Sequence, residues 1–122
     1  MSRLENLLSD YGIAWNAVAE RFGNDAGLYL KCLGMFVADK NLETLNSALQ
    51  CGDFGIAFRA AHTIKGMSSN MGFDGVTAAA CAIVEPLRAK DTAVDYDDLF
   101  AELSKEMQLI GELKAKADGY GN

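Results

Sequence analysis

The side chains most suited to chemistry lie together around the single histidine of this chain, His62. Imidazole is the only side chain whose ordinary pKa lies near neutrality, so it can act as a nucleophile or proton carrier at cellular pH. Lys65 follows three residues later and Gly66 four residues later, and both spacings place a residue on the same side of a helix as His62. This pattern suits a histidine that is reached from outside and that carries negative charge.

Two cations flank His62 on the expected helix. Lys65 could hold an oxyanion placed on the ring, and Arg59, three residues before it, could do so from the other side. A phosphoryl group has close to two negative charges and strong acceptor oxygens, so a nearby lysine would stabilise it. For both cations the alternative is an ordinary solvated charge. The residues alone leave a reactive and a structural histidine equally open.

Gly66 is a candidate opening over the ring. Side chains on a helix lean towards its N-terminus, so a side chain at position 66 would drape back over His62. A glycine in mid-helix costs about 1 kcal/mol relative to alanine. Gly55 and Ser69 lie on the same stripe, and their small side chains leave the surface there open. We regard Arg59, Gly66 and Ser69 as candidate partner contacts. The alternative for Gly66 is close helix–helix packing.

The apolar spacing is helical throughout, and no segment alternates convincingly like a strand. We expect short helical segments at about 3–10 and 14–22, a helical stretch at 25–50, and helices at about 53–71, 74–89 and 95–117. The stretch 25–50 is either one bent helix or two helices with a break near Asp39-Lys40-Asn41. The expected helix ends are Gly23, Gly52 and Gly72, and the expected N-caps are Asn24 or Asp25, then Asp53 and Asp74. Pro86 should kink its helix or shorten it.

Helical periodicity also predicts which side chains are buried. On 53–71 the expected core stripe is Phe54, Ala57, Ala61, Ile64, Ser68 and Met71. His62 lies one step off this stripe, beside Gly55, Phe58, Arg59, Lys65, Gly66 and Ser69, so its ring should lie at the edge of the buried face. The stretch 25–50 buries Tyr29, Leu33, Phe36, Val37, Leu42, Leu45 and Leu49, and the last helix buries Phe100, Leu103, Met107 and Ile110. Asp95, Asp97 and Asp98 in the first turn of that helix, with Lys114 and Lys116 in its last, complement the helix dipole.

These elements predict an all-α fold. Four longer helical segments with connections of two to six residues favour an antiparallel up-and-down four-helix bundle. One or two short N-terminal helices would close one end of it. We expect a single domain over residues 1–122, and any loose order only at its ends, 1–12 and 118–122. The methionine start and the capping at both ends favour a free-standing protein over a module of a larger kinase.

Composition excludes several functions. With 17 acidic and 11 basic residues the net charge is −6, so nucleic acid and anionic membranes are poor partners. The N-terminus lacks an apolar core of signal-peptide length and no window approaches a membrane span, so we expect a cytoplasmic protein. Cys32, Cys51 and Cys81 form no CxxC motif, and with one histidine they make no credible zinc site. We expect them to act as small apolar residues, and we expect no metal or cofactor site of the chain's own.

The sequence around His62 resembles a known signature. Residues 60–72 read Ala-Ala-His-Thr-Ile-Lys-Gly-Met-Ser-Ser-Asn-Met-Gly. This is similar to the signature of the histidine-containing phosphotransfer (HPt) domain family of multistep phosphorelays, which has the form His-x-x-Lys-Gly, then small residues, then Asn-x-Gly. Segment 22–30 and Gly52-Asp53 also resemble this family, and the resemblance covers about residues 10–115.

The resemblance implies a phosphoryl carrier rather than an enzyme. In this family the histidine, here His62, accepts a phosphoryl group from an aspartyl phosphate on a receiver domain and passes it to another receiver aspartate. Lys65 would neutralise phosphoryl charge and Gly66 would permit close docking. The implied partners are response-regulator receiver domains and a hybrid sensor histidine kinase, with Mg²⁺ supplied by the receiver. We expect a monomer that binds these partners transiently.

Two other functions compete with this one. The first is a non-phosphorylated helical adaptor that keeps the fold and binds receiver domains or kinases without transfer. Loss of the histidine would have indicated it, but His62, Lys65 and Gly66 are all present. The second is a small hydrolase that uses His62 as a base, for which the spacing shows no nucleophile with an orienting carboxylate.

Overall fold

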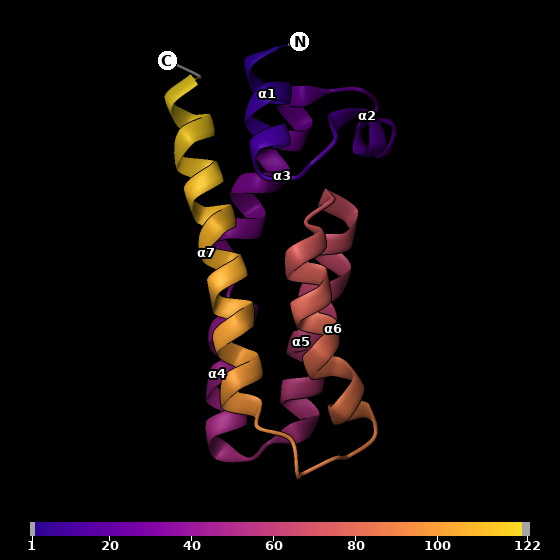
Figure 1. Ribbon diagram of the computed structural model, residues 1–122, viewed down its shortest axis with the longest axis vertical. Coiled ribbons are helices and arrows are strands. Elements are labelled where there is room, and N and C mark those ends of the chain that lie inside the picture. Colours follow the sequence, from indigo (N-terminus) through magenta and orange to yellow (C-terminus); the bar gives the residue numbers. More distant parts are fainter. Residues whose placement is uncertain (1, 121–122) are drawn as a thin grey trace.

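The computed structural model describes residues 2–120, and this part of the chain is helical, without strands. Its elements are α1 (Arg3–Asp10), α2 (Trp15–Val18), the 3₁₀ helix η1 (Ala19–Phe22), α3 (Ala26–Ala38), α4 (Asn41–Cys51), α5 (Phe54–Met71), α6 (Asp74–Arg88) and α7 (Tyr96–Tyr120). Together α3 and α4 form one leg of a bundle whose other legs are α5, α6 and α7 (Figure 1). The predicted all-α antiparallel bundle with short N-terminal helices is confirmed.

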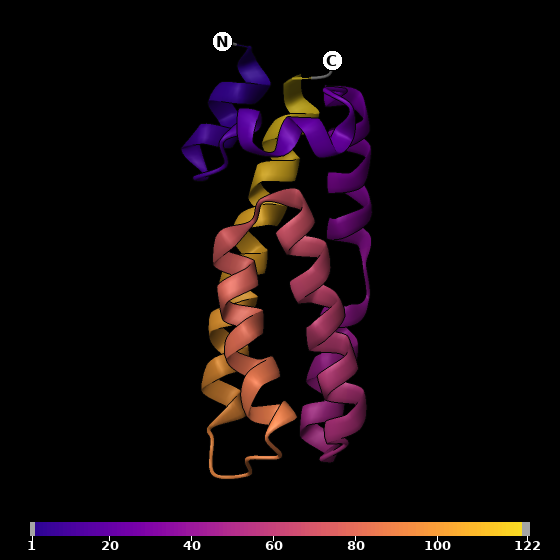
Figure 2. The same cartoon turned by 90° about the vertical axis from the view of Figure 1, so that its right-hand side faces the viewer.

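The helices surround one apolar core. α5 packs against α4 and α6, whereas α7 packs mainly against α6, α1 and α3. Helices α5 and α7 are therefore diagonal across the bundle, and the α5–α6 hairpin faces the viewer in Figure 2 with α7 behind it. The fully buried side chains between the legs include Tyr29, Leu33, Leu45, Ile64, Ile83, Leu103 and Leu113. The outer face of α5 is thereby left to solvent while its inner face is fixed.

The short N-terminal helices close one end of the bundle, at which the two ends of the chain also lie (Figure 1). Leu7 and Leu8 of α1 are buried in the core. Of the two end segments in which we expected any loose order, residues 1, 121 and 122 lie outside the described residues. No helix within 2–120 is long and apolar enough to cross a membrane.

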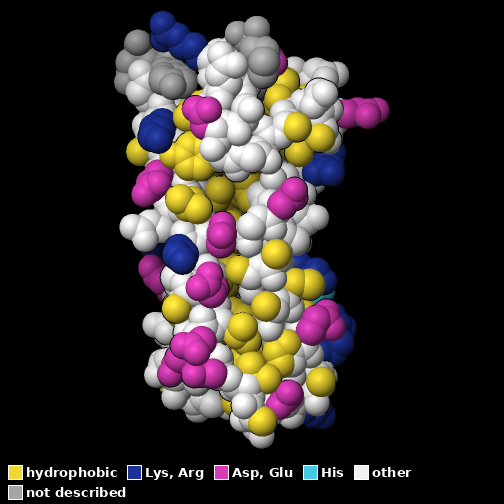
Figure 3. Space-filling model, viewed as in Figure 1, with side chains coloured by type: hydrophobic (Ala, Val, Ile, Leu, Met, Phe, Trp, Pro, Cys, Tyr) yellow, Lys and Arg dark blue, Asp and Glu magenta, His cyan; other side chains and the backbone are white. Residues whose placement is uncertain are grey.

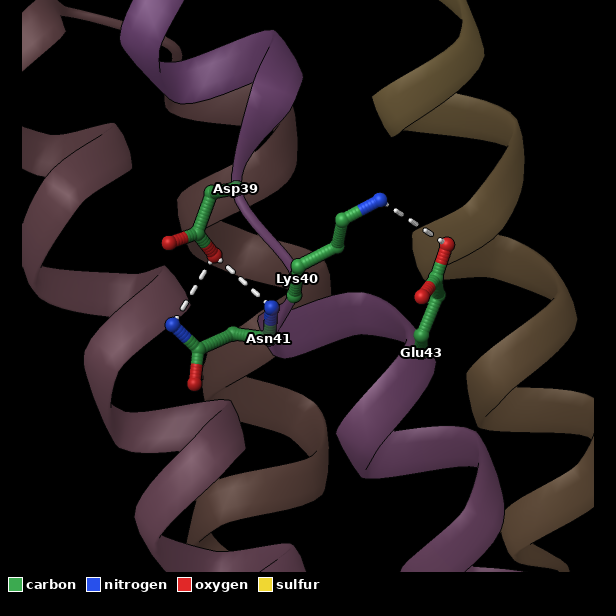
Figure 4. A network of polar contacts seen from close by, with 4 residues as sticks. All are labelled: Asp39, Lys40, Asn41 and Glu43. Carbon is green, nitrogen blue, oxygen red and sulfur yellow. Dashed lines mark hydrogen bonds and ion pairs between the residues drawn. The ribbon is translucent and has the colours of Figure 1, made fainter.

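The stretch 25–50 is two helices, because a side chain takes over the backbone hydrogen bonding between them. α3 ends at Ala38, and Asp39 has extended backbone angles of −65° and 147°. Its Oδ2 accepts hydrogen bonds from the backbone N and from Nδ2 of Asn41, both at 2.8 Å (Figure 4). Lys40 Nζ lies 3.7 Å from Glu43 Oε1 beside this turn. Such local side-chain bonds offer the backbone an alternative to a continuous helix.

Glycines end three of the predicted elements as expected. Gly23, Gly52 and Gly72 all have left-handed backbone angles at C-cap positions. Asp25 caps α3 by accepting a hydrogen bond from the backbone N of Leu28, and Asp53 caps α5 by accepting one from the backbone N of Ile56.

The predictions for the caps and limits of α6 and α7 were partly wrong. Asp74 is the first residue of α6 and the N-cap is Phe73, which has no side-chain cap bond. α6 ends at Arg88, two residues after Pro86. Asp95 caps α7, but Lys114 and Lys116 are not in its last turn because the helix continues to Tyr120.

Most of the predicted core residues are buried, but four of them only pack partly buried against the core: Leu42, Leu49, Phe100 and Met107. Val37 is 41% exposed and Phe54 is 36% exposed, although both were expected in the core. Each lies in a terminal turn, where the neighbouring helices no longer cover every side of the helix. Cys51, in the last turn of α4, is exposed for the same reason, while Cys32 and Cys81 are partly buried as expected. Ala60 of α5 joins the core instead.

Candidate functional site

His62 lies near the middle of α5 with its side chain exposed. Its neighbours Ala61 and Ile64 are fully buried, so the bundle fixes the backbone that carries the ring. The centroid of the imidazole lies 5.8 Å from that of Phe58, with the two planes tilted by 31°. Within the described residues the imidazole makes no hydrogen bond and no ion pair. An open ring on a fixed helix is what nucleophilic attack on an incoming group requires.

Residues from the N-terminal part of the chain hold the C-terminal end of α5. Arg21 Nη1 donates to the carbonyl oxygens of Ser69 at 3.1 Å and Asn70 at 3.0 Å. The hydroxyl of Tyr29 donates to the carbonyl oxygen of Met71 at 2.8 Å. Burial raises the pKa of Tyr29, so its phenol stays protonated and remains a donor. These bonds satisfy carbonyls that the end of a helix leaves without partners.

The two predicted cations differ in their surroundings. Lys65 is half-buried, and its ammonium group forms no ion pair with any residue between 2 and 120. Arg59 is exposed one turn before His62, and its backbone carbonyl accepts from Thr63 Oγ1 at 2.9 Å. Both positive charges are thus free to meet an anion at the ring.

Gly66 lies on open surface. A Cβ built at this position would have no heavy atom within 4 Å apart from the local helix backbone and its two chain neighbours. The alternative role in close helix packing is therefore wrong for Gly66. Ser69 is exposed one turn further along, and its carbonyl oxygen holds Arg21 as described above.

Two residues of the site were not predicted from the sequence to act there. Phe58 contacts the imidazole, and Arg88 of α6 lies over the Phe58 ring with Cζ 5.3 Å from the ring centroid. Arg88 Nε is also 3.8 Å from Glu85 Oε2, in a pair that is largely exposed. Helix α5 itself carries no Asp or Glu, but Glu85 of α6 approaches this face through its pair with Arg88.

Positive charge gathers around this face although the chain is acidic overall. Figure 3 shows the histidine colour at the right-hand edge of the molecule, beside Lys and Arg side chains and an acidic one. The contributing cations are Arg59 and Lys65 of α5, Arg88 of α6 and Arg21 of η1. No group of three or more His, Cys, Asp or Glu among residues 2–120 is arranged to hold a metal ion. The site is therefore suited to binding anions.

Comparison with known protein families matches residues 35–115, 81 of the 122 residues, to the family described as Hpt domain. The comparisons with curated proteins and with solved structures gave no significant match. The matched part contains α4, α5, α6 and most of α7, and hence His62. The chain belongs to the Hpt domain family, whose members are phosphoryl carriers in the histidine phosphotransfer of phosphorelays and have receiver domains as partners.

Proposed function

We propose that His62 carries the phosphoryl group of this Hpt domain. It accepts the group from an aspartyl phosphate on a receiver domain, reached through a hybrid sensor histidine kinase, and passes it to an aspartate of another receiver. The observation that supports this most is the open ring of His62 on the outer face of α5, within the matched part of the chain. As the only histidine, it is also the only residue that can form phosphohistidine.

The transfer requires little chemistry from this chain beyond positioning. A neutral imidazole nitrogen attacks the phosphorus, the N–P bond forms, and the bond from phosphorus to the aspartate oxygen breaks, so the carboxylate leaves with the electron pair. The second transfer reverses these steps on a different aspartate. Alignment of nucleophile and phosphorus is the main demand, and the buried side of α5 meets it by fixing the backbone.

Charge stabilisation comes from the neighbours of His62. Lys65, without an ion pair of its own within the described residues, neutralises part of the charge on the phosphoryl oxygens. Arg59 approaches from the other side of the ring. Gly66 and Ser69 keep the surface low so that the receiver can come close.

The residues around His62 do not fit a divalent cation of the chain's own. Arg59 and Lys65 are positive and Gly66 offers no side chain, whereas Mg²⁺ prefers carboxylate oxygens. We therefore assign Mg²⁺ to the receiver domain.

Transfer from a labelled, phosphorylated receiver domain in Mg²⁺ tests this proposal. Wild-type protein should gain a label that is labile in acid and stable in alkali, as phosphohistidine is. His62→Gln should gain none, while its circular dichroism and melting temperature stay close to wild type because the side chain is exposed. Label that persists in His62→Gln would refute the assignment. Stable receiver binding by wild type without any transfer would instead support the adaptor.

A further inference from the structure

A hollow of about 540 Å³ lies beside His62, between the first half of α5, the end of α6 and the connection to α7. Its apolar lining comes from Phe54, Phe58, Leu87 and Tyr96. The rings of Phe54 and Tyr96 lie 5.6 Å apart, and the hydroxyl of Tyr96 donates to the carbonyl oxygen of Asp91 at 2.6 Å. The connection after α6 is thereby held against α5.

The rim of this hollow is cationic. Arg59, Arg88 and Lys90 line it, and no Asp or Glu does. In a chain of net charge −6 this is an unusual concentration of positive charge. Acidic residues lie just outside the lining: Glu85 pairs with Arg88 in an exposed contact of 3.8 Å, and Asp91 and Asp95 are next to Lys90 and Tyr96 in the chain. An apolar floor with a positive rim is complementary to an apolar side chain flanked by carboxylates.

The hollow is continuous with the proposed phosphorylation site. The Phe58 ring forms part of its lining and also contacts the imidazole of His62. Phe54 precedes His62 by eight residues, which corresponds to about 12 Å along a helix. A protein partner of ordinary size covers about 800 Å², a disc of roughly 16 Å radius. Any receiver centred on His62 would therefore cover this hollow.

We propose that the hollow is a docking subsite for the receiver domain, which inserts an apolar side chain into the space lined by Phe54, Phe58 and Tyr96 and places acidic groups against Arg59, Arg88 and Lys90. This proposal rests on the proposed function, because it names the surface by which the receiver reaches His62. The subsite acts on affinity and on the choice of receiver. The transfer chemistry remains with His62 and Lys65.

Two groove variants with two matched controls test the proposal. Phe54→Ala removes an aromatic wall, and Lys90→Glu reverses a rim charge. Lys90 has a φ of 56°, a conformation equally unfavourable for Lys and Glu, so backbone strain does not change. Leu109→Ala and Lys105→Glu make the same kinds of change on α7, diagonal to α5, where Leu109 is 41% exposed and Lys105 forms only an exposed pair with Glu102.

The measurement is the initial rate of transfer to each variant at increasing concentrations of one phosphorylated receiver, the one that transfers fastest to wild type. Phe54→Ala and Lys90→Glu should each raise the KM for the receiver about tenfold and leave kcat within about twofold. The effect of Lys90→Glu should shrink at high salt, because salt screens exposed charges. The α7 variants should keep the wild-type KM. If Phe54→Ala fails to fold, the comparison of Lys90→Glu with Lys105→Glu still tests the docking subsite.

The outcomes separate this proposal from the function it rests on. If transfer to wild type occurs but groove and α7 variants have equal KM values, the subsite is refuted while His62 keeps its role. A loss of kcat with an unchanged KM would also overturn it, since docking would then be intact. If wild type receives no phosphoryl group, the proposed function itself fails.

Discussion

Replacement of Gly66 should separate the stability of the fold from its activity. The residue lies inside α5, its φ is not positive, and a Cβ there would contact no atom of the packed neighbours. Alanine should therefore raise the free energy of unfolding by about 1 kcal/mol through its helix propensity, without a clash, and leucine should raise it slightly less. For a chain of this size 1 kcal/mol corresponds to a rise in melting temperature of about 4 °C.

The same change should impair phosphotransfer in proportion to side-chain size. A leucine at position 66 leans towards the N-terminus and covers the approach to His62, whereas an alanine Cβ stays clear of the ring. Displacing the partner by about 1 Å can reduce a transfer rate by about 100-fold. We expect Gly66→Leu to lose at least about tenfold in kcat/KM and Gly66→Ala to stay within about threefold.

Urea denaturation followed by circular dichroism gives the stability, and transfer from a phosphorylated receiver gives kcat/KM for both variants. Destabilisation by Gly66→Ala would show that the glycine is required by the fold. A stabilised Gly66→Leu with normal transfer would refute the idea that an open surface at this position serves docking. Either result would contradict the reasoning from this position.

Three further changes test the site and its support. Lys65→Ala should slow transfer about tenfold through lost charge stabilisation, with unchanged urea denaturation; an unchanged rate would make Lys65 an ordinary solvated charge. Gly72→Ala should lower the free energy of unfolding in urea by about 2–4 kcal/mol, because φ is +81° and the new Cβ would lie 2.7 Å from Val18 Cγ1. The control Gly52→Ala, where φ is +75° and a Cβ meets no neighbour, should lower it by about 1 kcal/mol. Equal losses would rule out the clash. Because burial raises the pKa of Tyr29, its stabilisation is complete below the ordinary pKa of about 10 and is lost as pH rises through the raised value. At pH 7 the free energy of unfolding of Tyr29→Phe should therefore be about 1 kcal/mol lower than that of wild type. Between pH 9 and 11 it should decrease less with pH than the wild-type value does. An equal decrease in both proteins would contradict this.

Much of the site follows from one helix and could be predicted from the sequence. Residues three and four apart share a side of a helix whatever surrounds it, so the places of His62, Lys65 and Gly66 relative to one another were fixed by spacing. The exposure of His62 followed from its position one step off the apolar stripe, because the bundle buries that stripe. Glycines and aspartates at helix ends act through their own backbone and the next few residues, which is why the limits of α5 were predicted closely.

For two features the sequence left alternatives that only the structure could decide: the break within 25–50 and the burial of Phe54. A continuous apolar stripe allows 25–50 to be one helix or two, and the choice depends on whether Asp39 bonds to Asn41. Phe54 fits the core stripe by periodicity. Its ring nevertheless lies against Tyr96 at the surface, because the core does not extend to the first turn of α5.

The sequence determined a helical domain with one open histidine between two cations, since helical spacing is a property of consecutive residues. Tertiary structure alone decided that Arg88 lies over Phe58, that Arg21 holds the end of α5, and that Tyr96 closes a hollow beside the site. These partners are 30 to 50 residues apart in the chain, and no short-range pattern encodes such distances. They meet because antiparallel packing buries the apolar faces of the helices and thereby brings distant polar edges together.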